Sequence, residues 1–259
     1  VQWRERRSDP AEDAAFVAAL RRHDLHPLFV HAPYLLNLAS PDRALRGRSI
    51  RRLIADMRVA GAWQAEGVVL HLGSGGPDTP PRQAVQRVAT ALRQVLRDTD
   101  GPTRLILENS AGQGNTVGDT PEELAAVVDL AGDERLGLCL DTAHAFAAGY
   151  AIHTPEGLDA LLQRLDRLVG LGRLRLIHAN DSRGALGSNR DRHWHIGKGE
   201  IGPAGWRAIM AHEKLRPLPF IMETPKGLKT ALEEDLRNLR ALRRYIAREI
   251  RPQLPCKRL

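Results

Sequence analysis

Six short apolar runs in the sequence are each followed by a side chain that can bind a metal ion. These side chains are His31, His71, Glu108, Asp141, His178 and Glu223. A single histidine after a strand is more often a hydrogen-bonded loop residue than a ligand. Six independent coincidences are implausible, and such ionisable groups are costly to gather without a compensating cation. Imidazole and carboxylate ligands without cysteine predict a catalytic site for zinc or manganese.

The apolar runs have the length and composition of strands that are buried on both faces. They cover residues 27–30, 68–70, 105–107, 138–140, 174–177 and 220–222. Helical patterns follow them, for example Pro81 to Arg97, Pro121 to Leu130, Pro155 to Val169 and Leu228 to Ile250. Another helix opens the chain, with Ser8 or Asp9 as its cap before Pro10. Strand–helix alternation at roughly 35–45 residues per unit indicates a parallel α/β barrel or a doubly wound sheet.

The placement of the candidate ligands decides between these two architectures. In a barrel the carboxyl ends of all strands converge on one face, where active sites lie. A doubly wound sheet spreads its strand ends along a line and cannot gather six of them at one point. We therefore predict an α/β protein with a TIM-type (β/α) barrel, as a single domain over residues 1–259.

The charge of the chain bears on its partners. The formal net charge is +7 and the sequence pI is about 10.0. A basic surface attracts polyanions through counterion release, so nucleic acid is the first partner to consider. An arginine-rich chain with a solvated basic surface explains the same numbers, and charge alone leaves both interpretations open.

The cysteines and the first residues indicate a compartment. Cys139 and Cys256 are far apart in the sequence, which favours a reducing environment over a disulfide framework, and we expect Cys139 to face the core. The chain starts Val-Gln-Trp-Arg-Glu-Arg-Arg, without an apolar signal region, and contains no apolar run of membrane-spanning length. We expect a cytoplasmic protein without membrane contact.

Several longer segments resemble the endonuclease IV family of zinc-dependent apurinic/apyrimidinic endonucleases. The segments are residues 31–41, 107–115, 139–149, 178–181, 191–193, 197–202 and 222–225. They are ordered along the chain from near its start to about residue 240. The resemblance implies a xylose-isomerase-like barrel, a trinuclear zinc site in which one ion is replaceable by manganese, and damaged double-stranded DNA as the partner of a monomeric enzyme.

The resemblance also assigns nine metal ligands. His31 and His71 resemble ligands of a first zinc, and Glu108 resembles a bridge to a second. The remaining ligands of the second zinc correspond to Asp141, His178 and Glu223. The third zinc's ligands correspond to His144, Asp191 and His193. The spacing of Asp141 and His144, three apart at a strand-to-helix junction, lets both face one cavity.

The resemblance implies hydrolysis of the phosphodiester 5′ to an abasic site, leaving a 3′-hydroxyl. Paired divalent ions generate a hydroxide near neutral pH and clamp the phosphate, and Glu108 would hold that hydroxide with them. The abasic nucleotide would be extruded, which is cheap because its stacking and pairing are already lost.

Contacts to DNA are expected from the loops that follow the strands. Tyr34 and Leu35 could wedge into the minor groove, as the family's loop does, although packing at the rim explains them equally well. Four basic residues near the third-metal segment are candidate phosphate contacts, with ordinary surface basicity as the alternative. They are Arg183, Arg190, Arg192 and Lys198.

Two other functions compete with this hypothesis. A metal-dependent sugar isomerase or epimerase of the same barrel superfamily needs one four-ligand site, here Glu108, Asp141, His178 and Glu223. The five further ligands exceed that requirement and favour phosphate chemistry. A non-catalytic barrel that binds DNA or another partner is the second alternative, and the presence of all nine ligands counts against a degenerate site.

The number of strands departs from the family pattern. A barrel of this type has eight strands, six are predicted here, and in the family a tryptophan like Trp3 follows the second strand. We therefore expect the barrel to be incomplete at its N-terminus, with the first two strands absent and roughly 40 residues missing upstream. Open edges at the His31 and Glu223 strands expose unpaired backbone groups, so this form should be less stable than a complete chain or pair with another copy.

Overall fold

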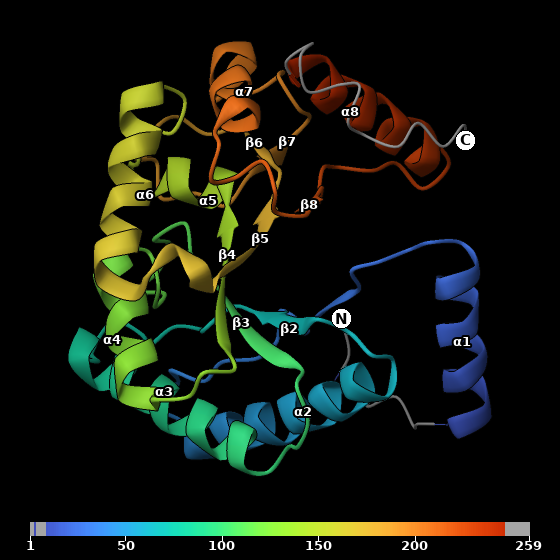
Figure 1. Ribbon diagram of the computed structural model, residues 1–259. Coiled ribbons are helices and arrows are strands. Elements are labelled where there is room, and N and C mark those ends of the chain that lie inside the picture. The colour runs from blue at the N-terminus through green and yellow to red at the C-terminus, as the bar shows by residue number, and fades with distance from the viewer. Residues whose placement is uncertain (1–2, 4–8, 247–259) are drawn as a thin grey trace. The chain divides into compact units, whose positions relative to one another are not determined.

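The computed structural model describes Trp3 and residues 9–246, in which helices alternate with parallel strands (Figure 1). The described chain falls into two compact units. The first consists of the chain up to Cys139 together with the segment Leu168–Arg175. The second consists of Leu140–Arg167 and the chain from Leu176 onward. Strands β4 (Leu136–Asp141) and β5 (Leu174–His178) run from the first unit into the second.

Parallel strands form the centre of the first unit. Their order is β1 (Phe29–His31), β2 (Gly67–Leu70), β3 (Arg104–Glu108) and β4. The register aligns their carboxyl ends, because His31 pairs with Val69 and Glu108 with Cys139. All of β2 is buried, so the sheet is covered on both faces, as the continuous apolar runs predicted.

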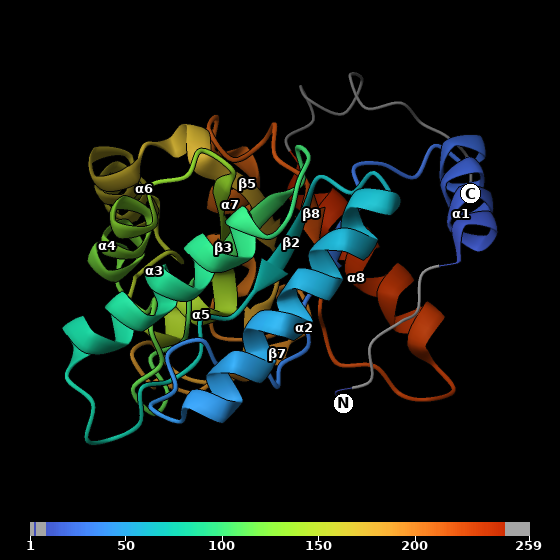
Figure 2. The same ribbon diagram turned by 90° about the horizontal axis from the view of Figure 1, so that it is seen from below.

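Three helices of the first unit pack one after another: α2 (Arg43–Ala62) lies beside α3 (Pro81–Arg97), and α3 lies beside α4 (Pro121–Ala131) (Figure 2). Their inner faces carry Leu53 and Leu92, both fully buried. Helix α4 is capped at its start, because Thr120 Oγ1 accepts a hydrogen bond from the Glu123 amide at 3.2 Å.

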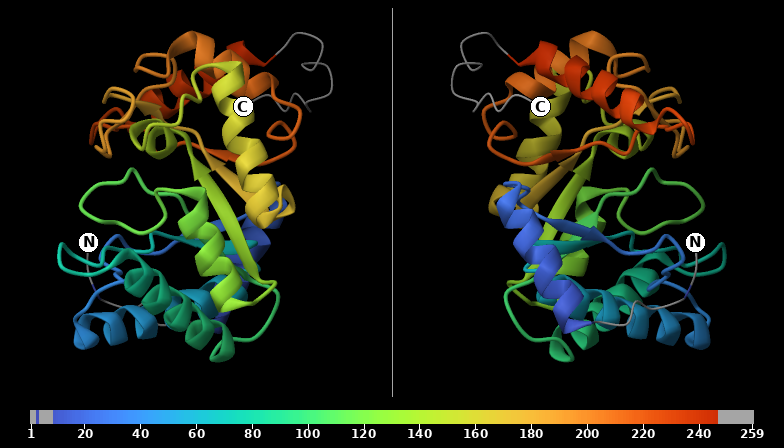
Figure 3. Two further views of the ribbon diagram at one scale, coloured as in Figure 1. Left: turned by 90° about the vertical axis from the view of Figure 1, so that its left-hand side faces the viewer. Right: turned by 90° about the vertical axis from the view of Figure 1, so that its right-hand side faces the viewer.

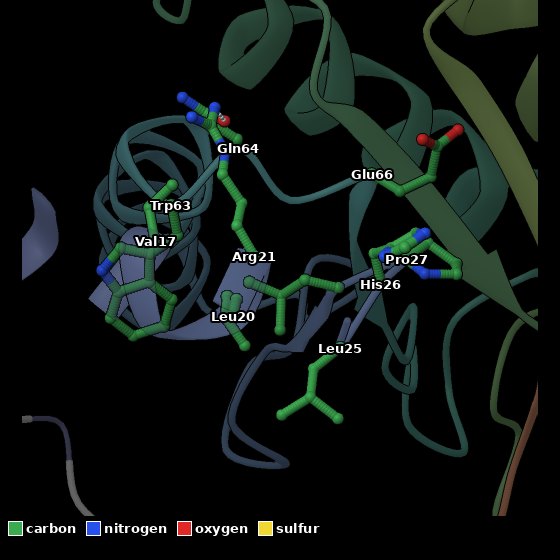
Figure 4. A pocket seen from close by; sticks show the side chains of 10 residues that line it. Val17, Leu20, Arg21, Leu25, His26, Pro27, Trp63, Gln64 and Glu66 are labelled. Carbon is green, nitrogen blue, oxygen red and sulfur yellow. Dashed lines mark hydrogen bonds between the residues drawn. The ribbon is translucent and has the colours of Figure 1, made fainter. Parts of the chain in front are cut away.

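Helix α1 (Pro10–Arg22) is tied to the end of α2 by two contacts. The indole Nε1 of Trp63 donates to Asp13 at 2.7 Å, and the Phe16 ring lies 4.8 Å from the Trp63 ring. Beside them, a hollow of about 380 Å³ opens near the amino ends of β1 and β2, where Arg21 donates to Gln64 Oε1 at 2.6 Å (Figure 4). This hollow is at the strand ends opposite to His31 and His71.

The second unit contains the ends of β4 and β5, of which β5 pairs in parallel with β8 (Phe220–Ile221). It also contains the helices α5 (Thr142–Ala147), α7 (Gly202–Ala211) and α8 (Ala231–Tyr245), and all but the last two residues of α6 (Pro155–Val169). A 3-10 turn at Leu171–Arg173 precedes β5 in the first unit. Helices α7 and α8 pack against each other and appear in orange and red in Figure 3. The fully buried Trp206 of α7 anchors the core.

A short antiparallel pair, β6 (Asp181–Ser182) with β7 (His193–Trp194), was not predicted. Each strand has two residues, too few to produce an alternating pattern in the sequence. This pair matters for the site because β7 begins with one candidate ligand.

The predicted helices agree with the structure more closely than the predicted strands, each of which differs by one or two residues at one end or both. Helices α3 and α6 have the predicted ends, and α4 ends one residue later. The first strand starts at Phe29 rather than Pro27, which lacks the amide needed for the ladder. The C-terminal helix begins at Ala231 because Leu228 is fully exposed and has no core to join. Its predicted end, and Cys256, are outside the described residues, whereas Cys139 is buried in β4 as expected.

Candidate metal centre

The first unit brings together three of the predicted ligands. His31 ends β1, His71 directly follows β2, and Glu108 ends β3, so the aligned carboxyl ends of three adjacent strands place them side by side. His31 Nε2 lies 3.1 Å from Glu108 Oε2, and His71 Nε2 lies 3.6 Å from the same oxygen. The ligand atoms of all three residues are within 4.8 Å of one another.

The hydrogen bonds of this first group suit a cation. His31 Nδ1 is 2.8 Å from the carbonyl oxygen of Ala32, which can only accept, so the ring proton is on Nδ1. In a neutral imidazole this leaves the Nε2 lone pair directed at Glu108, whose side chain is fully buried. Two electron-rich atoms at 3.1 Å repel each other unless a positive charge lies near both, so these residues fit a divalent ion.

A second group forms in the second unit around Asp141, His144 and His193. Asp141 caps the short helix α5, because its Oδ1 accepts from the His144 amide at 2.8 Å. His193 Nε2 lies 3.5 Å from Asp141 Oδ2 and 3.3 Å from His144 Nε2. Asp191 Oδ1 is 3.3 Å from both imidazole Nε2 atoms.

This second group also fits a cation. His193 Nδ1 lies 3.3 Å from the carbonyl oxygen of Glu223, which can only accept. The ring proton is therefore on Nδ1, and Nε2 carries a lone pair. That lone pair converges with His144 Nε2 and with two carboxylates, an arrangement typical of zinc or manganese ligands.

The remaining two ligands, His178 and Glu223, lie next to Asp141. His178 Nδ1 is 3.1 Å from Glu223 Oε2 and 4.0 Å from Asp141 Oδ2. Asp141 therefore lies between this pair and the histidines of the second group. All nine predicted ligands are in the described part of the chain, while their assignment to particular ions, including the bridge by Glu108, stays a prediction.

Sequence reasoning did not assign roles to Asn180 and Asp181. Asn180 is buried, donates from Nδ2 to Asp141 Oδ2 at 2.6 Å, and accepts the Glu223 amide on Oδ1 at 2.8 Å. Asp181 is buried and accepts from the amides of Gly197 and Ile201 and from Trp206 Nε1. Both directly follow the ligand segment at His178, which was the signal available in the sequence.

The predicted DNA contacts are mostly exposed side chains. Tyr34 is 69% exposed, and its ring forms a T-shaped pair with the His71 ring, with the ring centres 5.4 Å apart, whereas Leu35 is half-buried. The Arg183 guanidinium lies 4.8 Å over the Trp194 ring. The other basic candidates, Arg190, Arg192 and Lys198, are exposed. Within the described residues, no helix is long and apolar enough to cross a membrane.

Comparison with known proteins agrees with this description. The family described as "Xylose isomerase-like TIM barrel" matches residues 2–242. A "Probable endonuclease 4" of Methanoculleus marisnigri is 42% identical over 226 residues, covering 86% of this chain and 79% of the relative. Endonuclease IV from Thermus thermophilus is 39% identical, with a TM-score of 0.80 over 94% of this chain and 84% of that structure. A D-tagatose 3-epimerase-like protein, 22% identical with a TM-score of 0.71 over 92% of this chain and 84% of its own, shares the fold alone.

The fold and these relatives define a phosphodiesterase of the nuclease class on an α/β barrel, as predicted. The chain belongs to the endonuclease IV family.

Proposed function

We propose that this protein is a DNA-repair endonuclease that hydrolyses the phosphodiester 5′ to abasic sites and leaves a 3′-hydroxyl. The observation that carries the proposal is the set of ligands beyond the four that a single-metal isomerase needs. His31 and His71 gather at Glu108 in one unit, and His144, Asp191 and His193 gather at Asp141 in the other. These additional ligands support a multinuclear centre suited to phosphate chemistry.

The proposed centre holds three divalent ions, zinc with manganese as a possible replacement at one position. His31, His71 and Glu108 would hold one ion, and His178, Glu223 and Asp141 a second. A third would bind His144, His193 and Asp191. When bound, the ions would supply Lewis-acid stabilisation of the negative charge on the reacting phosphate.

The protein's own residues orient this centre. The carbonyl oxygens of Ala32 and Glu223 hold the protons of His31 and His193 away from the site, which keeps each Nε2 available as a ligand. Asn180 fixes the carboxylate of Asp141 and the backbone of Glu223.

Abasic DNA is proposed as the substrate because the ligands are accompanied by an exposed aromatic side chain and exposed cations. Tyr34 stands beside His71 and could fill the space of the missing base, and Arg190, Arg192 and Lys198 could contact phosphates.

The test is a nicking assay on a duplex oligonucleotide with one abasic site. We expect wild-type protein loaded with zinc or manganese to cut 5′ to the site, and a chelator to stop the reaction. Glu108→Gln should lower the rate about a hundredfold or more, because it replaces the buried carboxylate between His31 and His71. The matched control is Glu134→Gln, at an exposed glutamate outside both ligand groups.

The outcomes separate the alternatives. Wild-type protein that binds DNA but never nicks it, with either metal supplied, would support a binding protein instead. Activity on a keto sugar without nicking would support an epimerase. Equal nicking by Glu108→Gln and wild type would contradict the proposed centre.

A further inference from the structure

A basic groove lies in the second unit, and none of the predicted metal ligands lines it. Its volume is about 510 Å³, and it is lined by the loop around His195 and Lys198 and by helix α8. The helix contributes Arg237, Arg240 and Arg244, and among the described residues that line the groove the carboxylate is Glu233. Four cationic side chains thus surround a hollow large enough for a phosphate group and its neighbouring sugars.

The spacing of the arginines places them on one side of the helix. Positions 237, 240 and 244 are separated by three and four residues, the intervals that bring helical side chains to the same face. Arg237 and Arg240 are exposed, as is Lys198. Their charged groups are therefore open to a ligand from solvent.

The loop that lines the groove is held in place by buried polar side chains. Asn238, 1% exposed, accepts the Ile196 amide on Oδ1 at 3.0 Å, and its Nδ2 lies 3.1 Å from His195 Nδ1. Asp181 accepts the Gly197 amide at 2.8 Å. A loop fixed in this way loses little conformational freedom when a ligand binds, so the groove is organised in advance.

The neighbouring acidic residues do not cancel the positive charge. Glu234 accepts the Gly227 amide at 2.7 Å, and this hydrogen bond, with a smaller effect of the nearby Arg237 charge, holds the pKa of its carboxyl below the usual range. Asp235 pairs with Lys226 at 3.1 Å. Even with Arg244 left out, the exposed cations Lys198, Arg237 and Arg240 outnumber Glu233 and Glu234 in the described part of the chain. The groove therefore favours an anion.

We propose that this groove binds a phosphodiester of the DNA backbone other than the one that is cleaved. This inference rests on the proposed function. The loop carrying Lys198 continues directly from the candidate ligand His193, five residues earlier, so one segment links the metal ligands to the groove. Guanidinium groups bind phosphate oxygens through paired hydrogen bonds, which suits Arg237 and Arg240 to a backbone phosphate.

The experiment measures how binding of the zinc-loaded protein to an undamaged duplex depends on salt. For Arg237→Ala/Arg240→Ala we expect about tenfold weaker binding at low salt, and a plot of log K against log salt that is shallower by about 1. Arg237→Lys/Arg240→Lys should restore most of the slope because it keeps the charges. The matched control is Arg207→Ala, an exposed arginine of α7 outside the groove, and it should leave the slope unchanged.

An unchanged slope in the double alanine variant, or an equal change in Arg207→Ala, would overturn the proposal. So would a titration in which inorganic phosphate binds the groove as tightly as the duplex, since that would indicate a site for a free anion. Nicking of an abasic duplex is measured separately. Wild-type protein that shows the predicted slopes but never nicks would overturn the proposed function and leave the groove standing.

Discussion

The side-chain amide of Asn180 donates a 2.6 Å hydrogen bond to Oδ2 of Asp141, although the two residues are 39 positions apart. The same amide group lies 3.4 Å from Glu223 Oε2. One neutral side chain thus orients two candidate ligands. Residues that orient ligands commonly set the affinity of a metal site.

Replacing Asn180 should therefore weaken metal binding. For Asn180→Leu, of similar size but without the amide, we expect zinc affinity to fall about 10- to 100-fold. Competition with a chromogenic chelator measures the affinity. The control is Gln163→Leu, at an exposed amide on α6. Equal affinities of the two variants would show that Asn180 does not act on the ligands.

Removing the metal should destabilise the protein. Glu108 and Asp141 are buried carboxylates, and without cations their charges lose compensation. We expect the Tm to fall by on the order of 10 °C after chelation and to recover on zinc addition. Elemental analysis of the reloaded protein should give about three ions per chain. A content of one ion per chain would favour the isomerase alternative.

Tyr34 should contribute to recognition of the abasic site. It is 69% exposed beside His71, and an aromatic ring that stacks in a vacated base position is worth about 1–3 kcal/mol. For Tyr34→Ala we expect kcat/KM on an abasic duplex to fall about tenfold or more, and Tyr34→Phe to retain most activity. If Tyr34 only packs at the rim, Tyr34→Ala would lower the Tm and leave kcat/KM unchanged.

The raised pKa of Glu123 leads us to expect that the stability of the protein depends on pH. Burial raises the pKa of its carboxyl above the usual 4.5, and the Asp119 charge adds to this, against a hydrogen bond from the Gly118 amide. Folding therefore favours the neutral form, whose stabilising effect is complete below pH 4.5 and is lost as pH rises through the folded-state pKa. Glu123→Gln keeps the acceptor without the charge.

We expect Glu123→Gln to raise the Tm by about 2 °C at pH 7 and to change it little at pH 4. Thermal unfolding followed by circular dichroism at both pH values is the measurement. A lower Tm of the variant at pH 7 would contradict the effect of burial.

Gly199 should tolerate no side chain. A Cβ at this position would overlap the carbonyl oxygen of Ser182 and the Oδ1 of Asp181, because the loop passes close to β6. We expect Gly199→Ala to lower the Tm by about 5 °C, as overpacking of a close contact does. Gly172→Ala is the control, since its Cβ would meet no atom within 4 Å. Equal Tm values for the two variants would refute the close approach.

The sequence by itself determined the elements and the identity of the candidate ligands. Apolar runs, prolines at helix starts and the residue after each run are local signals, set by neighbours in the chain. They predicted the bounds of α3 and α6 and placed His31, Glu108, Asp141 and His178 at strand ends, where the structure has them. The long ordered motifs predicted the family, which the comparisons confirm.

Only the tertiary structure decided which side chains meet. It brought Asp141 within 3.5 Å of His193, 52 residues later in the chain, and within 4.0 Å of His178. It also revealed Asn180 and Asp181 as buried groups that hold ligands and loops, and the β6–β7 pair that positions His193. The hydrogen bonds of Asn180 and Asp181 to these ligands and loops join residues 16 to 43 positions apart, so they depend on how strands and loops pack, which no local pattern encodes.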